Sequence, residues 1–170
     1  MADMEALMSD CTLCPRNCHV NRRAGQKGFC GCSDQVRGAR AALHYWEEPC
    51  LSGTEGSGAV FFSGCALRCV FCQNHEISRG KAGKAVSREQ LAGICLKLQS
   101  QGANNINLVT AGHFLEEVIP ALVLAKEQGL KIPVVYNTGG YEKPDTLKRL
   151  EGLVDIWLPD MKYRSADLAR

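Results

Sequence analysis

Three cysteines directly after a short apolar segment constrain the fold of this chain more than any other feature. Cys65, Cys69 and Cys72 follow the pattern C-x3-C-x2-C. The preceding apolar segment, residues 59–62, predicts a buried strand, and Gly64 predicts a turn at its end. Three thiolates can hold three corners of a [4Fe–4S] cluster and leave the fourth iron open to a second molecule. The pattern therefore predicts a metal-binding loop at the end of a core strand.

Two other interpretations of these cysteines are a structural zinc site and a set of unrelated core cysteines. Structural zinc sites usually contain two separated C-x2-C pairs or Cys/His pairs, and the spacing here is different. The spacing therefore favours an iron–sulfur cluster. Because one iron would stay open, such a site can be reactive as well as an electron store.

The composition changes near residue 58, and this change predicts two regions. Residues 1–58 are rich in Cys, Gly and Arg with little periodicity, so we expect a Cys-rich, metal-binding N-terminal extension. Residues 59–170 alternate between apolar strands and amphipathic helices, and we expect them to form the core. The predicted strands are 59–62, 106–109, 133–137 and 154–158, and the predicted helices are 87–101, 115–129 and 144–153.

Strand–helix alternation predicts an α/β fold with a parallel sheet and right-handed crossovers. In β/α barrels, the chemistry lies at the carboxyl ends of the strands. Each predicted strand leads into polar or glycine-rich residues, which are the three cysteines and then 110–113, 136–140 and 160–162. Convergence of these four strand ends would form the mouth of a cofactor site.

Three segments resemble the radical S-adenosylmethionine (radical SAM) superfamily, in particular proteins similar to pyruvate formate-lyase activating enzyme that carry a Cys-rich N-terminus. These segments are residues 61–74, 135–142 and 154–163. The resemblance implies a partial (β/α) barrel of radical SAM type. The family core has six strand–helix units and this sequence supplies about four. We therefore expect a C-terminally truncated member or a fragment, with an unpaired edge at its fourth strand.

The resemblance also implies roles for individual residues. The three cysteines would ligate the cluster, and Phe71 would pack near the cluster and the adenine of S-adenosylmethionine. In the family, one stretch of the chain holds the methionine amine of S-adenosylmethionine. Here this stretch corresponds to Thr110, Ala111 and Gly112, and it lacks the acidic residue that the family usually has. The positions that contact S-adenosylmethionine or an adjacent cation correspond to Asn137, Thr138, Asp160 and Lys162.

The activity implied by the resemblance is reductive cleavage of S-adenosylmethionine to a 5′-deoxyadenosyl radical, which then abstracts hydrogen. The implied partners are S-adenosylmethionine, a reductant such as flavodoxin or ferredoxin, and a glycyl-radical enzyme as the protein activated. The alternative is a non-catalytic iron–sulfur or zinc-binding module. Formation of 5′-deoxyadenosine would discriminate between an enzyme and such a module.

Four cysteines of the N-terminal region can close a four-thiolate site for zinc or for a second iron–sulfur cluster. They are Cys11, Cys14, Cys18 and Cys30. His19 or Cys32 could replace one of these ligands, and the alternative is a set of free thiols in a loosely folded extension. Cys50 has no obvious partner, and Cys95 falls on the apolar face of a predicted helix, where we expect a core position.

Charge and cysteine content narrow the possible partners and the compartment. A net charge of +2 gives no reason to expect nucleic acid or an anionic membrane as a partner. No apolar stretch is long enough to span a bilayer, and the N-terminus lacks the pattern of a signal peptide. Ten cysteines without an export signal favour metal or redox chemistry in a reducing cytoplasm over a disulfide framework.

Overall fold

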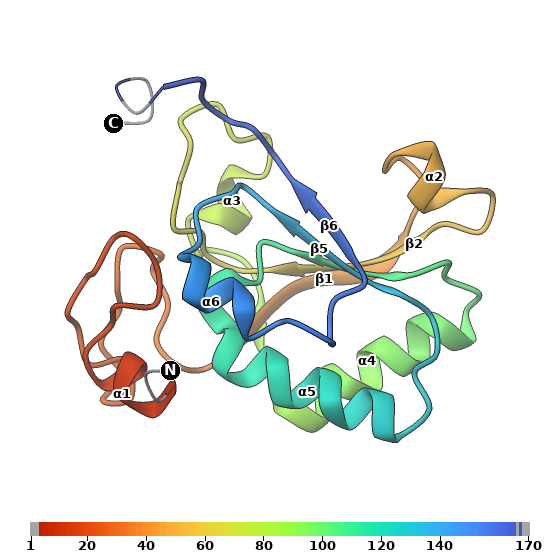
Figure 1. Cartoon of the computed structure of the whole chain (residues 1–170), viewed down its shortest axis with the longest axis horizontal. Helices are drawn as coiled ribbons and strands as arrows, with labels where there is room; N and C mark the ends of the chain where they lie inside the picture. Colours follow the sequence, from red (N-terminus) through yellow and green to blue (C-terminus); the bar gives the residue numbers. More distant parts are fainter. Residues whose placement is uncertain (1–3, 166, 168–170) are drawn as a thin grey trace.

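One mixed sheet organises the chain in this computed structural model, which describes residues 4–165 and 167. The strand order across the sheet is β3-β1-β2-β4-β5-β6 (Figure 1). The strands are β1 Arg37–His44, β2 Ser57–Phe62, β3 Lys84–Ala85, β4 Ile106–Val109, β5 Val134–Thr138 and β6 Ile156–Pro159. The protein is therefore an α/β protein, as the sequence predicts.

The strands β2, β4, β5 and β6 pair in parallel, and they coincide with the four strands that the apolar runs predict. β1 is a strand that the sequence pattern does not predict, and it pairs antiparallel with β2 and β3. Its residues are half-buried or exposed, so it lacks the apolar run of a fully buried strand. β1 lies before residue 58, in the predicted N-terminal extension, yet it pairs with strands of the predicted core. The boundary between two domains near residue 58 stays a prediction.

Two long helices cover one face of the sheet, α4 at Arg88–Ser100 and α5 at Leu115–Glu127 (Figure 1). The shorter helices are α1 Met4–Ser9, α2 Pro49–Ser52, α3 His75–Ser78, the 3-10 turn Gly112–Phe114 and α6 Pro144–Lys148. Pro120 lies inside α5. α6 ends at Lys148, earlier than the predicted residue 153, and hydrogen-bonded turns then lead to β6.

The hydrophobic core lies between the sheet and these two helices. Val60, Leu108 and Tyr136 form one row across β2, β4 and β5 and are almost fully buried. Leu91 of α4 and Leu122 of α5 belong to the same buried cluster. Burying a large apolar side chain contributes roughly 1.5–3 kcal/mol. This face of the sheet is therefore structural, and the opposite face is available for function.

The N-terminus of α4 is closed by a capping box that Ser87 forms with Gln90. The Ser87 hydroxyl accepts from the Gln90 amide at 3.2 Å, and the Ser87 amide donates to the Gln90 side chain at 2.9 Å. We expect Ser87→Ala to lower the free energy of unfolding by about 1 kcal/mol, because one orphan amide loses its acceptor. Denaturant unfolding tests this, with Ser87→Thr as the control that keeps the hydroxyl. Equal stability of Ser87→Ala and the parent protein would contradict it.

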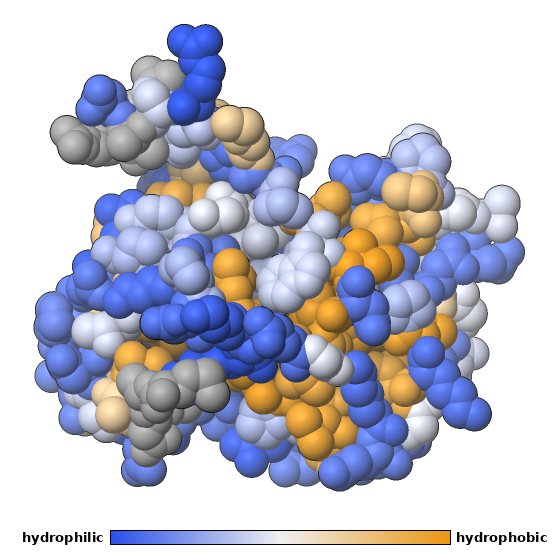
Figure 2. Space-filling view, in the orientation of Figure 1, coloured by the Kyte–Doolittle hydropathy of each residue, from blue (hydrophilic) through white to orange (hydrophobic). Residues whose placement is uncertain are grey.

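The edge strand β6 and the adjacent part of α5 leave apolar surface uncovered. Figure 2 shows apolar surface, in orange, on this face of the molecule beside the sheet edge. Val123 of α5 and Trp157 of β6 are about two-fifths exposed. Within the described residues, no helix has the length and apolarity needed to cross a membrane.

Candidate functional site

A large cavity lies on the sheet face opposite the two long helices. Its volume is about 580 Å³. One row of cross-strand partners lines it, in the order Arg40, Phe61, Val109, Asn137 and Leu158. Since side chains alternate along a strand, this row points away from the core row that packs on α4 and α5. The cavity is therefore built by the same four parallel strands that organise the fold.

The cysteine loop follows β2 and reaches the rim of this cavity. Cys65, Cys69 and Cys72 are half-buried, and all three line the cavity. Gly64 and Arg68 have positive φ values of 89° and 52°, which turn the chain sharply around the first cysteine. The loop thus brings the three predicted cluster ligands to one end of the cavity.

The three thiols lie close enough to affect each other's ionisation. Burial raises the pKa of the Cys65 thiol, and the charges of Cys69 and Cys72 raise it further. Over residues 4–165 and 167, no three His, Cys, Asp or Glu side chains already stand as they would around a metal. A cluster would thus need the thiols to turn inward, and the donor set of three thiolates beside an open cavity fits a [4Fe–4S] cluster with one free iron.

Six of the residues that the resemblance assigns to S-adenosylmethionine also line the large cavity. They are Phe71, Thr110, Asn137, Thr138, Asp160 and Lys162. Asp160 and Lys162 form an ion pair with each other, and Phe71 packs edge-on against Tyr163 with ring centroids 6.0 Å apart. These side chains come from the strand ends and the loop that were predicted to converge, and the structure brings them together with the three cysteines.

The segment of residues 110–112 has each of its three residues in a different environment. Thr110 lines the large cavity with an unusual positive φ of 58°, and its amide donates to the Asn137 carbonyl at 2.9 Å. Ala111 is fully buried in the hydrophobic core. Gly112 lines a separate small pocket with Glu142. Only Thr110 of this segment therefore reaches the cavity that the cysteines share.

Glu142 is a half-buried carboxylate of the small pocket beside the large cavity, and sequence reasoning did not assign it. Its Oε1 accepts from the Thr138 hydroxyl and from the Tyr136 hydroxyl at 3.3 Å. Burial raises the pKa of Glu142. A Cβ atom on Gly112 would lie 2.8 Å from the same oxygen. The sequence feature that could have indicated Glu142 is its position four residues after Thr138, in a loop that follows a core strand.

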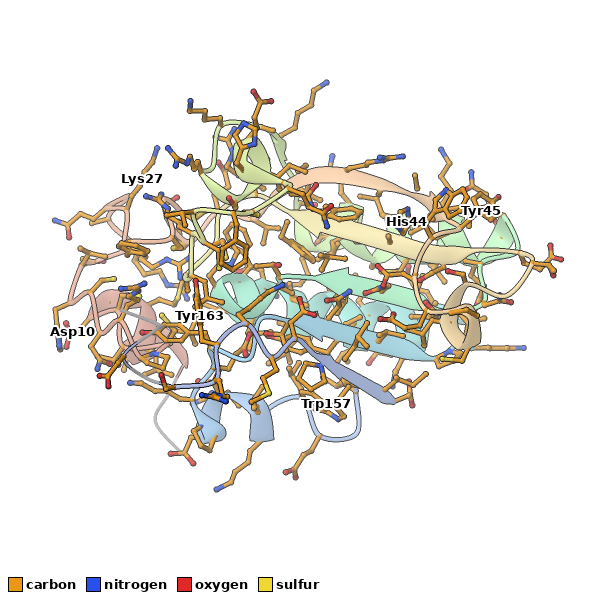
Figure 3. All side chains as sticks on the ribbon, turned by 90° about the horizontal axis from the view of Figure 1, so that it is seen from above. Asp10, Lys27, His44, Tyr45, Trp157 and Tyr163 are labelled. Atoms are coloured by element: carbon orange, nitrogen blue, oxygen red, sulfur yellow. The ribbon has the colours of Figure 1, made fainter. Side chains whose placement is uncertain are left out.

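The unpredicted strand β1 and the segment after it supply a further wall of the cavity. Arg40, His44, Trp46, Glu47 and Glu48 all line it. Burial raises the pKa of Glu47, with a further contribution from Glu48. Figure 3 places His44 and Tyr45 at the end of the sheet remote from Asp10 and Tyr163. The cavity therefore extends along the sheet from the cysteine loop towards these carboxylates.

The N-terminal cysteine segment lies against the strand ends, beside α6 (Figure 1). Arg16 donates to the Ala66 carbonyl in the cysteine loop at 3.0 Å. Lys143 donates to the Thr12 carbonyl at 2.6 Å, and the Thr146 hydroxyl donates to the Leu13 carbonyl at 2.9 Å. The segment is therefore fixed to the loops around the candidate site, and is not loosely folded.

His113 lies fully buried behind the cysteine loop and packs against Phe114. Its Nε2 is 2.8 Å from the Ser63 carbonyl, which makes Nε2–H the donor. Burial lowers the pKa of His113 to about 4, and the charge of Arg22 lowers it further. The ring is therefore neutral near pH 7, and this geometry assigns it a structural role.

We expect the stability of the protein to fall in acid because of this buried ring. His113 in the unfolded chain takes up a proton near pH 6.5, whereas the folded chain resists protonation down to about pH 4. The free energy of unfolding should thus drop by about 1.5 kcal/mol between pH 6.5 and pH 5 through this group. Denaturant unfolding at both pH values tests this, with His113→Gln as the comparison. An unchanged pH dependence in His113→Gln would refute the assignment.

Comparisons with known proteins agree with this geometry. The family model described as the radical SAM superfamily matches residues 59–159, from β2 to the end of β6. The chain therefore belongs to the radical SAM superfamily. This membership carries with it the [4Fe–4S] cluster and S-adenosylmethionine as cofactors of the family.

Individual relatives give a narrower comparison. Two uncharacterized proteins of Methanocaldococcus jannaschii are 30% and 24% identical over 92% and 89% of this chain, and it covers 46% and 49% of their lengths. A pyruvate formate-lyase-activating enzyme of Clostridium pasteurianum is 33% identical over 64% of this chain and 46% of its own length. The chain thus spans about half the length of the curated relatives it matches. No solved structure matches it significantly.

Proposed function

We propose that this protein binds a [4Fe–4S] cluster at Cys65, Cys69 and Cys72 and cleaves S-adenosylmethionine reductively to a 5′-deoxyadenosyl radical for hydrogen abstraction. One observation carries the proposal. The three cysteines share a single cavity of about 580 Å³ with Asn137 and Asp160. A cluster bound there would supply the electron that breaks the sulfonium bond, with methionine as the second product.

The residues of the cavity have separate tasks in this proposal. The Asn137 amide can both donate to and accept from the bound S-adenosylmethionine. Asp160 offers a carboxylate to its positive charge, and Lys162 offers an ammonium group to its carboxylate. The side chains of Phe61, Val109 and Leu158 form the apolar wall next to them. This wall limits the access of water to the reacting groups.

The most specific activity that we propose is activation of a glycyl-radical enzyme. The support is the similarity to the activating enzyme of Clostridium pasteurianum over 116 aligned residues. In that reaction the hydrogen would come from a backbone glycine of the partner protein, and a flavodoxin or ferredoxin would deliver the electron. A partial (β/α) barrel, with the parallel strands β2, β4, β5 and β6 as its wall, is the architecture that we propose for this core.

We also propose that Cys11, Cys14, Cys18 and Cys30 bind a second metal. All four line one small cavity, which supports a common site. All ten cysteines are free thiols, which supports residence in a reducing compartment such as the cytoplasm. On this proposal, residues 1–58 form a metal-binding extension packed on the radical SAM core.

Anaerobic reconstitution tests the main proposal. The protein is loaded with iron and sulfide, reduced with dithionite and incubated with S-adenosylmethionine, and 5′-deoxyadenosine is measured by mass spectrometry. We expect product that depends on the reductant and on the cluster. A fully loaded cluster that yields no 5′-deoxyadenosine would contradict the proposal and favour a non-catalytic iron–sulfur module.

A further inference from the structure

The four N-terminal cysteines converge because the chain between them folds back on itself. The Cys11 amide donates to the Val20 carbonyl at 3.0 Å, and the His19 amide donates to the Cys11 carbonyl at 3.1 Å. Asn17 and His19 have positive φ values of 44° and 54°, which reverse the chain between Cys14 and Val20. The charges of Cys11, Cys18 and Cys30 all act on the Cys14 thiol, whose pKa is raised first by burial. The four cysteines thus lie around one small cavity.

The structure also selects the fourth cysteine. Cys30 lines the small cavity with the other three, whereas Cys32 does not. The Cys32 thiol instead donates to the Ser63 carbonyl at 3.2 Å. His19, the other substitute, is exposed, and its Nδ1 pairs with Asp10 at 2.9 Å. Cys30 is therefore the ligand that the geometry favours, because it lines the cavity and Cys32 and His19 do not.

The size of this cavity distinguishes a single ion from a cluster. Its free volume is about 10 Å³. That is the volume of roughly one water-sized sphere, so in this arrangement the cavity suits one metal ion better than the eight atoms of a cubane. Four thiolates around one ion form the tetrahedral arrangement that is typical of structural zinc. The four side chains must turn inward to reach it, because no three such side chains within residues 4–165 and 167 already hold a metal arrangement.

Arg22 is a buried cation beside the four thiols, and it indicates independently that this cavity accommodates negative charge. Arg22 lines it and is only 1% exposed. Its Nε and Nη2 donate to the neutral Ser33 carbonyl, at 3.1 Å and 2.5 Å, and its guanidinium lies over the Phe114 ring. Within the described residues, no carboxylate forms an ion pair with Arg22. A buried charge without a counter-charge is very costly, so the cavity calls for an anionic group.

We propose that Cys11, Cys14, Cys18 and Cys30 bind one divalent ion of the zinc type, and that Arg22 balances the excess negative charge of this four-thiolate centre. Four thiolates and one divalent cation carry a net charge of two minus, which a neighbouring guanidinium partly neutralises. The inference rests on the second-metal part of the proposed function, and it adds the nuclearity of the site and its charge partner. It is independent of the chemistry at Cys65, Cys69 and Cys72.

Metal analysis of the full chain tests the nuclearity. The Cys65→Ala, Cys69→Ala, Cys72→Ala triple variant removes the proposed cluster and leaves the N-terminal cysteines intact. We expect one zinc and no iron or sulfide per chain in this variant. Replacement by Co²⁺ should give the absorption bands of a tetrahedral thiolate site. Absence of any bound metal, or iron with sulfide in place of zinc, would overturn the proposal. Failure of S-adenosylmethionine cleavage would leave these readouts unchanged.

Substitutions at the site test the fourth ligand and the role of Arg22. We expect Cys30→Ser to lose the ion, whereas Cys32→Ser and the exposed Cys50→Ser retain it. Arg22→Met should weaken zinc binding about 10- to 100-fold in competition with a chelator, as is typical when a partner of the ligands is removed. Arg22→Lys should weaken it less. Arg37→Met is the matched control, because Arg37 also donates to a backbone carbonyl, that of Gly83, without lining the cavity.

Two results would overturn these assignments. If Cys30→Ser keeps the ion and Cys32→Ser loses it, the fourth ligand is Cys32 and not Cys30. Zinc affinity that is equal in Arg22→Met and Arg37→Met would remove Arg22 from the site. If Arg22→Met does not fold, the comparison between Arg22→Lys and the parent protein decides, and equal affinities there have the same consequence.

Discussion

Replacement of Cys65, Cys69 and Cys72 by alanine is expected to abolish the electron paramagnetic resonance signal of the reduced protein and to reduce 5′-deoxyadenosine formation to background. The three thiols are the predicted ligands of the cluster, and they meet at one rim of the large cavity. They lie outside the hydrophobic core cluster, so the fold should survive with a loss of about 1 kcal/mol or less. Spectroscopy, iron analysis and denaturant unfolding of the same samples separate loss of the cluster from loss of the fold.

Two other cysteines serve as controls for this experiment. Cys50 is exposed, and Cys50→Ala should keep the full cluster content. Cys95 is 1% exposed on α4, so Cys95→Ala should destabilise the fold while leaving the signal in the folded fraction. A triple variant with unchanged iron content and an unchanged spectrum would refute the ligand assignment.

The second large effect is expected at the glycine that precedes the first cysteine. Gly64 has a φ of 89°, and a Cβ atom there would lie 2.4 Å from the Cys32 sulfur and 2.6 Å from the Cys30 carbonyl oxygen. Gly64→Ala therefore combines backbone strain with a steric clash, and should lower the free energy of unfolding by about 2–5 kcal/mol. Because the clash lies between the N-terminal segment and the cysteine loop, cluster content should fall as well.

Substitutions at two other glycines separate the contribution of backbone strain from that of the steric clash. Gly102 has a φ of 90° with no atom within 4 Å of the added Cβ, so Gly102→Ala should cost only the backbone strain, about 1–2 kcal/mol. Gly93 lies inside α4 with open space around it, and Gly93→Ala should stabilise the protein by about 0.5–1 kcal/mol. Unfolding curves of the three variants test this order. A Gly64→Ala protein as stable as Gly102→Ala would show that the clash is relieved.

The parallel part of the fold could be predicted from the sequence because each central strand is buried on both faces. The strand at residues 106–109 was predicted with the bounds that β4 has, since three of its four residues, Ile106, Leu108 and Val109, are apolar. β1 could not be predicted in this way, because its Arg-Gly-Ala-Arg sequence shows no apolar run. Its position follows from antiparallel pairing with β2, which is a tertiary contact without a local signal.

The same distinction holds for the candidate site. The cysteine spacing is a local pattern, and it predicted three residues that the structure places on one cavity. Glu142 and Glu47 could not be found by spacing, because the cavities that they line are closed by segments that are distant in the sequence. The burial of Ala111 in the core is a packing result of the same kind. Local chemistry is thus readable from the sequence, whereas the walls of the cavity are not.

The contacts that hold the N-terminal segment have a consequence for the order of events during synthesis. Lys143 and Thr146 contact Thr12 and Leu13 across sequence separations of 131 and 133 residues. At a translation rate of roughly 5–20 residues per second, these partners emerge about 7–26 s after the segment that they fix. The first cysteines are therefore exposed to solvent before their cavity can close. On the metal site proposed above, their close spacing along the chain would allow metal capture in that interval, ahead of the folding of the sheet.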